Sequence, residues 1–267
     1  MTVVFPEVTI EAADGDAWQA TLAARWNVGR NQNGGVLLAT ASSVLCRAAR
    51  QSHPLTVTGH YLRATEAGEC SIRTSLIREG RTSTTATAEL RQGGKERLRV
   101  LGTFGDLAQR LHGGPSIVQP LAPPIPAPEH CEDLFDILTR TEAGEKALTR
   151  SLRNFAVRVD PDRGWGRGPD GQPRLSGWLR MNDEEAITPV MLLAIADAFP
   201  PTVMSSAVIG WLPTLELTVH VLGIPAADEP WLRAELTTRA VSGGLVDEDA
   251  SCGTRPGAWW PASASSP

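Results

Sequence analysis

The chain has 267 residues, 42% of them hydrophobic, which is enough to bury one large core or two domains of ordinary size. Its formal net charge of -5 provides no broad basic field, which argues against nucleic acid or an anionic membrane surface as a partner. No apolar run approaches the roughly 20 residues that cross a bilayer. The 4 cysteines show no CxxC spacing and no secretory signal precedes them, so we expect a cytoplasmic protein with reduced thiols.

The N-terminal elements lead into one buried helix. Residues 2–10 and 18–26 are predicted strands on either side of a turn at residues 13–16. Asn33-Gly34-Gly35 then opens an apolar helix that runs through Leu45. The two glycines allow a tight turn and leave bare amides at the helix N-terminus, where a negative charge or a polarised carbonyl oxygen is favoured.

Four strands follow the helix, which His53-Pro54 ends because a residue before proline avoids the helical region. The strands are predicted at residues 55–63, 69–79, 82–91 and 97–104. Short turns at residues 79–81 and 92–95 join the later strands as hairpins. This order predicts an α+β unit in which a curved antiparallel sheet wraps around one buried helix.

A proline-rich stretch separates two parts of the chain. Six prolines between residues 113 and 128 exclude a helix or a central strand and favour an extended connector. We therefore predict an N-terminal domain at residues 1–107, a linker with a short helix at residues 108–150, and a C-terminal domain at residues 151–267.

The second part repeats the first. Strands are predicted at residues 154–159 and 174–181, a helix at residues 189–199, and further strands from residues 214 and 231. His60 corresponds to His220, and the first helix aligns with the second so that Ser42 corresponds to Asp197. A duplication of this length predicts a tandem double domain with pseudo-twofold symmetry.

These residues resemble the TesB-like acyl-CoA thioesterases. The similarity rests on the order and spacing of five short motifs, which are Asn33–Gly35, His60–Arg63, Arg78–Arg81, Ala196–Pro200 and Pro213–Thr218. The resemblance implies a tandem (double) hot-dog fold and hydrolysis of acyl-CoA thioesters without a metal or cofactor. It also implies an aspartate, a threonine and a glutamine that position and activate water. The aspartate falls on Asp197 and the threonine on Thr214, whereas the glutamine would lie beyond Asp249, where this sequence departs from the pattern.

The chemistry of these residues leaves alternatives open. Asp197, at the end of a buried helix, gains a raised pKa from desolvation and is a candidate general base, or it simply caps the helix before Pro200. Thr214 either holds the same water or only packs in a strand. The Gly34 and Gly35 amides, with Asn33, either bind the substrate and polarise its carbonyl or only form a tight turn.

Two histidines at matched strand positions are weaker candidates. His60 and His220 have no serine elbow, metal-ligand spacing or carboxylate cluster beside them. We interpret both as structural and predict no metal site.

The C-terminal tail lacks the pattern that the repeat requires. Residues 250–267 show no alternation of apolar and polar side chains, so the last strand of the second sheet is expected to be missing and the tail loosely packed. A neighbouring reading frame forces valine and alanine near Trp259 and Trp260, which suggests a single-base deletion close to the Asp249 codon. Resequencing the gene and restoring one G tests this frameshift hypothesis.

The sequence thus predicts an acyl-CoA thioester hydrolase in which Asp197, assisted by Thr214, activates water. The alternative is a non-catalytic module that binds an acyl ligand or serves in assembly, inactivated by its altered C-terminus. Because hot-dog sheets leave edges that pair between protomers, we also expect a homo-oligomer.

Overall fold

The computed structural model describes residues 2–5, 7–113, 124–140, 142–162, 166–167, 171–183, 186–205, 212–253 and 260–266. The strands are β1 (Thr2–Phe5), β2 (Val8–Ala12), β3 (Ala17–Leu22), β4 (Asn27–Val28), β5 (Asn31–Gln32), β6 (His53–Tyr61), β7 (Gly68–Arg78), β8 (Ser83–Gln92), β9 (Lys95–Gly105), β10 (Glu132–Asp133), β11 (Phe155–Val159), β12 (Gly166–Arg167), β13 (Pro173–Met181), β14 (Glu216–His220), β15 (Leu232–Ser242), β16 (Leu245–Gly253) and β17 (Trp260–Ser266). The α-helices are α1 (Gly34–Ala48), α2 (Leu107–Gly113), α3 (Leu134–Leu138), α4 (Glu142–Ala147) and α5 (Met191–Ile195). Short 3-10 turns are η1 (Ala24–Trp26), η2 (Pro128–His130), η3 (Leu152–Asn154) and η4 (Thr202–Ser205).

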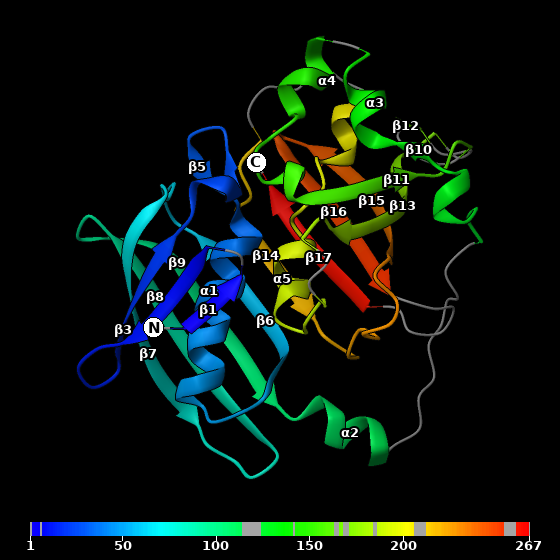
Figure 1. The fold of residues 1–267 in the computed structure, drawn as a ribbon. Coiled ribbons are helices and arrows are strands. Elements are labelled where there is room, and N and C mark those ends of the chain that lie inside the picture. Colours follow the sequence, from blue (N-terminus) through cyan, green and yellow to red (C-terminus); the bar gives the residue numbers. More distant parts are fainter. Residues whose placement is uncertain are drawn as a thin grey trace.

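Two equivalent half-sheets join into one continuous antiparallel sheet. The first half runs β3-β7-β8-β9-β6 and the second runs β14-β17-β16-β15-β13, so that β6 pairs with β14 at the centre. In that central pair Thr58 lies opposite Thr218, and their hydroxyl oxygens are 2.8 Å apart. The two halves curve around α1 and α5, which lie side by side inside (Figure 1). This architecture is the predicted tandem double hot-dog fold.

Helix α1 fills the first half because it is apolar on nearly every side. Its residues Leu38, Val44 and Leu45 have no exposed surface, as expected for a helix enclosed by a sheet. The facing strands alternate buried and exposed side chains, and on β8 the buried ones include Ala86, Ala88 and Leu90. Alternation with a period of two places one face of each strand on the core.

The second helix is much shorter than predicted. The sequence predicted a helix over residues 189–199, but α5 spans Met191–Ile195 and gives way to turns before Pro200. The proline pair Pro200-Pro201 opposes continuation of the helix because a residue before proline avoids helical angles.

Two expectations for the N-terminal strands are also wrong. Residues 2–10 form the hairpin β1–β2 rather than one strand, and Glu7 takes a positive φ of 62° at the turn. The strand predicted at residues 18–26 ends at Leu22, and η1 follows it. The proline at position 6 cannot donate a ladder hydrogen bond, which favours a turn at this point.

The expected loss of the last strand is wrong as well. Residues 260–266 form β17, which pairs with β14 on one side and β16 on the other (Figure 1). Strand β17 thereby takes the place that β9 occupies between β6 and β8 in the first half. Backbone hydrogen bonds between strands do not require a particular side-chain pattern. The edges of β14 and β16 can therefore pair with a strand whose side chains do not alternate. Residues 254–259, and residues 114–123 of the predicted linker, lie outside the described part of the chain, and the frameshift hypothesis stays a prediction.

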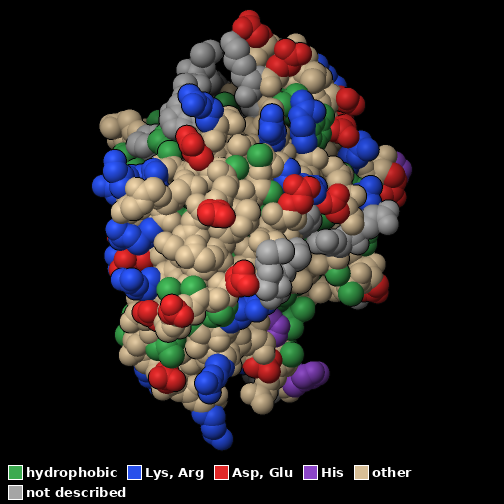
Figure 2. Space-filling model, turned by 60° about the vertical axis from the view of Figure 1, so that its left-hand side comes forward, with side chains coloured by type: hydrophobic (Ala, Val, Ile, Leu, Met, Phe, Trp, Pro, Cys, Tyr) green, Lys and Arg blue, Asp and Glu red, His purple; other side chains and the backbone are tan. Residues whose placement is uncertain are grey.

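Charged side chains of both signs are spread over the face shown in Figure 2. The mixture on that face agrees with the small negative net charge of the sequence. Within the described residues, no helix combines the length and the apolar character that spanning a membrane requires.

Candidate active site

Helix α1 begins at a turn that leaves no room for a side chain. Asn33 is its N-cap and accepts a hydrogen bond from the Val36 amide over 3.0 Å, as asparagine commonly does at a helix start. A Cβ added to Gly35 would lie 2.8 Å from the carbonyl oxygens of Leu193 and Ala194. The N-terminus of α1 therefore packs directly on the backbone of α5.

Asp197 lies just beyond α5 and receives the donors that begin α1. Its Oδ2 accepts hydrogen bonds from the Gly35 amide over 2.9 Å and from Asn33 Nδ2 over 3.0 Å. Asn33 Nδ2 also donates to the backbone oxygen of Asp197 over 2.7 Å. Because a helix N-terminus attracts negative charge, the carboxylate is held at the positive end of α1. The structure thus brings together Asn33, Gly34, Gly35 and Asp197.

Opposing effects set the acidity of this carboxyl group. Burial raises the pKa of Asp197 to about 6, and the negative charge of Glu248 acts in the same direction. The amides of Gly35 and Gly34 and the side chain of Asn33 lower the pKa because they bind the charged form. The carboxylate is therefore ionised at neutral pH yet basic enough to take up a proton, which suits a general base.

The glycine amides have a different partner from the one expected. The sequence suggested that they polarise a substrate carbonyl, but both donate toward the Asp197 carboxylate. An oxygen that becomes negative during catalysis requires other donors as long as this arrangement holds.

Thr214 does not join this cluster through a hydrogen bond. It lies in the loop before β14, which begins at Glu216 rather than at Thr214 as predicted. Across the described ranges, no hydrogen bond connects the Thr214 hydroxyl with Asp197. In the described structure, the two residues predicted to hold the water are therefore not joined by a hydrogen bond.

Two side chains near Asp197 were missed by the sequence reasoning. Tyr61, at the end of β6, packs its ring against Gly34. Glu248 on β16 accepts hydrogen bonds from the Thr202 amide over 2.7 Å, from its hydroxyl over 2.6 Å and from the Thr238 hydroxyl over 3.3 Å. Burial raises the pKa of Glu248. A signal for Tyr61 was present, because it lies within the His60–Arg63 motif.

The histidines and cysteines of the described residues show no sign of a second site. His60 and His220 are exposed at the ends of β6 and β14. Among the residues that the structure describes, no group of His, Cys, Asp or Glu is arranged to hold a metal ion. Burial raises the pKa of Cys46, Cys70 and Cys252 to about 12 in each case, which keeps these thiols protonated and poorly nucleophilic.

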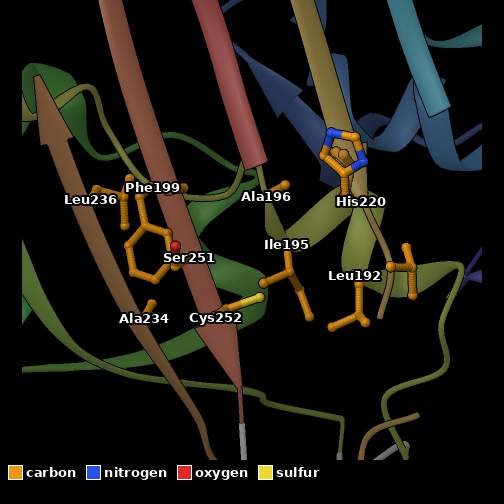
Figure 3. Close-up of a pocket in the computed structure, with 12 residues that line it drawn as sticks. Leu192, Ile195, Ala196, Phe199, His220, Ala234, Leu236, Ser251 and Cys252 are labelled. Atoms are coloured by element: carbon orange, nitrogen blue, oxygen red, sulfur yellow. The ribbon is translucent and has the colours of Figure 1, made fainter. Parts of the chain in front are cut away.

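An apolar pocket lies along α5. Two of its lining residues, Ala196 and Phe199, flank Asp197 in sequence. Figure 3 shows side chains from α5, β14, β15 and β16 directed into it. The lining residues from the helix and its end are Leu192, Ile195, Ala196 and Phe199, and those from the strands include Val219, Ala234, Leu236 and Cys252. The lining is mostly apolar, with His220 and Ser251 as its polar members, and it does not include Asp197.

Comparisons with known proteins agree with this architecture. Residues 22–105 match the acyl-CoA thioesterase N-terminal domain, and residues 128–258 match the acyl-CoA thioesterase C-terminal domain. An uncharacterized protein of Mycobacterium tuberculosis is 27% identical over 252 residues, covering 87% of this chain and 84% of its own length.

Solved structures share the whole fold. A putative thioesterase II from Thermobifida fusca has a TM-score of 0.82 at 24% identity, covering 97% of this chain and 94% of its own. A hot-dog protein of unknown function from Alicyclobacillus acidocaldarius has a TM-score of 0.80 at 16% identity, with 96% and 93% covered. The acyl-CoA thioesterase II TesB2 of Mycobacterium marinum has a TM-score of 0.72 at 16% identity, with 97% and 94% covered. With both of its halves matched in order, this chain belongs to the acyl-CoA thioesterase family of double hot-dog proteins.

Proposed function

We propose that the chain is a hydrolase that cleaves an acyl-CoA thioester with a water molecule activated by Asp197. The observation that carries the proposal is the position of the Asp197 carboxylate, held by Gly35 and Asn33 and brought by burial to a pKa of about 6. We assign the acyl chain to the mostly apolar pocket along α5, whose lining residues Ala196 and Phe199 flank Asp197 in sequence.

The proposed reaction begins with proton transfer from water to Asp197. Because Asn33 and Gly35 bind Oδ2, we assign Oδ1 as the oxygen that takes the proton. The water oxygen forms a bond to the thioester carbonyl carbon, and the carbonyl electron pair moves to its oxygen. When this pair returns, the carbon–sulfur bond breaks, and the departing thiolate takes the proton from Asp197. The products are a carboxylic acid and the thiol of coenzyme A.

A non-catalytic module that binds an acyl ligand is the second candidate. It is favoured by the lack of a hydrogen bond between Thr214 and Asp197 in the described structure and by a sequence after Asp249 that contains no glutamine. In this alternative the pocket and the carboxylate hold a ligand without turnover.

A panel of acyl-CoA thioesters assayed for free thiol distinguishes the two candidates. For the hydrolase, Asp197→Asn should lower kcat/KM by about 10³-fold or more, as removal of a proton-accepting group typically does. The matched control is Ser42→Ala, at the equivalent position of the first helix, which should retain wild-type activity. Ligand binding without thiol release by the wild type would support the module. Equal turnover by Asp197→Asn and wild type would contradict the assignment of Asp197.

We also propose that the protein is a homo-oligomer. Strands β1 and β10 end the described sheet on its two sides, and open strand edges are sites of pairing between chains. Light scattering coupled to size exclusion should give a mass above that of one chain, and a monomer mass would refute this proposal.

A further inference from the structure

Tyr61 carries a buried hydroxyl group without a partner. Within the described residues, its oxygen is shielded from solvent and has no hydrogen bond. Leaving a buried polar group unpaired is unfavourable because the group has lost its hydrogen bonds to water. Such a group therefore calls for an explanation, and a catalytic role is one of the recognised ones.

The ring of Tyr61 and the Asp197 carboxylate both pack against Gly34. Its Cε1 and Cζ atoms lie 3.0 and 3.1 Å from the position that a Cβ on Gly34 would take, and Asp197 Oδ2 lies 3.0 Å from the same point. The absence of a side chain at Gly34 is what allows the ring and the carboxylate to approach one another. Tyr61 is thus part of the wall of the Asp197 site.

The pseudo-twofold axis supplies an independent comparison. The Tyr61 amide donates to Leu215 O over 2.9 Å, and at the equivalent place the Val221 amide donates to Leu55 O over 2.9 Å. The backbones match, but Val221 has no hydroxyl. Of these two equivalent positions, the one with the hydroxyl is therefore the one that lies beside Asp197 at Gly34.

We propose that the Tyr61 hydroxyl donates a hydrogen bond to the carbonyl oxygen of the bound thioester and stabilises the negative charge that forms there. The inference rests on the proposed hydrolysis. In that reaction the carbonyl electron pair moves to oxygen as water attacks and returns as the carbon–sulfur bond breaks, and Tyr61 keeps its proton throughout. The glycine amides are occupied by Asp197, so the tyrosine is the donor that the site otherwise lacks.

The acidity of Tyr61 agrees with the role of a donor. Burial raises its pKa well above the ordinary value, and the nearby negative charges of Asp197 and Glu216 act in the same direction. The hydroxyl therefore keeps its proton at every pH at which Asp197 is an effective base.

The first test is Tyr61→Phe, which removes one oxygen atom. We expect kcat to fall about 10²-fold, as for the loss of one oxyanion donor, with KM changed less than about threefold because the bond strengthens only in the transition state. Ser42→Ala is the matched control, since it also removes a buried hydroxyl without a partner but lies outside the site. An active wild type with an equally active Tyr61→Phe variant overturns the proposal and leaves the hydrolase function intact.

A second test does not depend on turnover. Because the chain has a single tyrosine, labelling with 3-fluorotyrosine gives one fluorine resonance. The probes are S-(2-oxodecyl)-CoA, a ketone that keeps a carbonyl oxygen, and S-decyl-CoA, which has none. The ketone should shift the resonance, and the thioether should shift it much less. Equal shifts, or no shift at ketone concentrations that saturate binding, overturn the proposal even if the wild type hydrolyses nothing.

Discussion

The two halves of the molecule share a backbone plan but differ where their helices meet. Helix α1 has 15 residues and an asparagine cap, whereas α5 has 5 residues and no side-chain cap at Val190. The start of α1 meets the end of α5 through Gly35. At the positions equivalent to Gly34 and Gly35, the second helix has Pro189 and Val190. At the position equivalent to Asp197, the first helix has Ser42.

In the described structure, this difference leaves the proposed site at one of the two equivalent places of the duplicated fold. The central strands remain equivalent, as the pairing of Thr58 with Thr218 demonstrates. The proposed site requires both a carboxylate and bare amides to receive it, and of the two described helix starts, those of α1 and α5, only that of α1 meets both requirements, with Asp197. The predictions below test how far the asymmetry depends on each contact.

The largest effect is expected from Gly35→Ala. Its Cβ would lie 2.8 Å from backbone oxygens and from Asp197 Cβ, so α1 and α5 must separate. We expect stability to fall by about 1–3 kcal/mol, as for overpacking, and activity to fall about 10²-fold through misplacement of Asp197. Urea unfolding and the thiol assay measure the two effects. Ser43→Ala on the same helix is the control, and an unchanged unfolding midpoint for Gly35→Ala would contradict this prediction.

The second prediction concerns stability and pH. The folded pKa of Asp197 is about 6 against an ordinary 3.8, so the folded state holds the proton more tightly than the unfolded state. The contribution of Asp197 to stability is therefore greatest below pH 3.8 and declines as pH rises to 6, by up to roughly 3 kcal/mol. Asp197→Asn removes this penalty and should be more stable than wild type by about 1–3 kcal/mol at pH 7.5.

The comparison at pH 4 provides the control for that experiment. There the wild-type carboxyl is protonated, so the variant should lose most of its advantage. Asp14→Asn, in the exposed turn before β3, should follow the wild type at both pH values. An advantage of Asp197→Asn that does not change with pH would contradict the proposed cause.

A smaller effect is expected from Asn33→Asp. The aspartate keeps an acceptor for the Val36 amide but loses the donor to Asp197 and adds a negative charge beside it. The pKa of Asp197 should rise by about one unit, which lowers kcat/KM about tenfold below the new pKa. A pH–rate profile measures the midpoint. Asn33→Ser, which adds no charge, should shift the midpoint less, and a shift to lower pH in Asn33→Asp would refute the assignment.

The smallest effects are expected on the pseudo-twofold axis. Thr58→Val removes one side of the hydroxyl contact with Thr218 and should destabilise the protein by about 1 kcal/mol or less. Thr218 also donates to the Glu216 carboxylate, so Thr218→Val should cost more, about 1–2 kcal/mol. Thermal unfolding of both variants tests this order. A larger loss for Thr58→Val would mean that the Glu216 contact contributes little.

The local chemistry of the sequence was enough to predict most of the main elements and the start of α1, which forms one side of the proposed site. Glycine at positions 34 and 35 and asparagine at position 33 fix the start of a buried helix, and alternation fixes the strands from β6 to β9 within a few residues. The repeat of His60 at His220 indicated the duplication and hence the double fold. These signals are local, so they can be read without knowing which segments meet.

Only the tertiary structure decided which groups face Asp197. The approach of α1 to α5 gives its carboxylate the Gly35 amide from 162 positions away, and the closing of β6 over Gly34 brings Tyr61 beside it. The tail makes the same point, because β17 forms where β14 and β16 both present open edges. Edge pairing satisfies backbone groups whatever the side-chain pattern. The approach of the helices and the closing of the strands depend on packing across the whole core. No single stretch of sequence therefore predicts them.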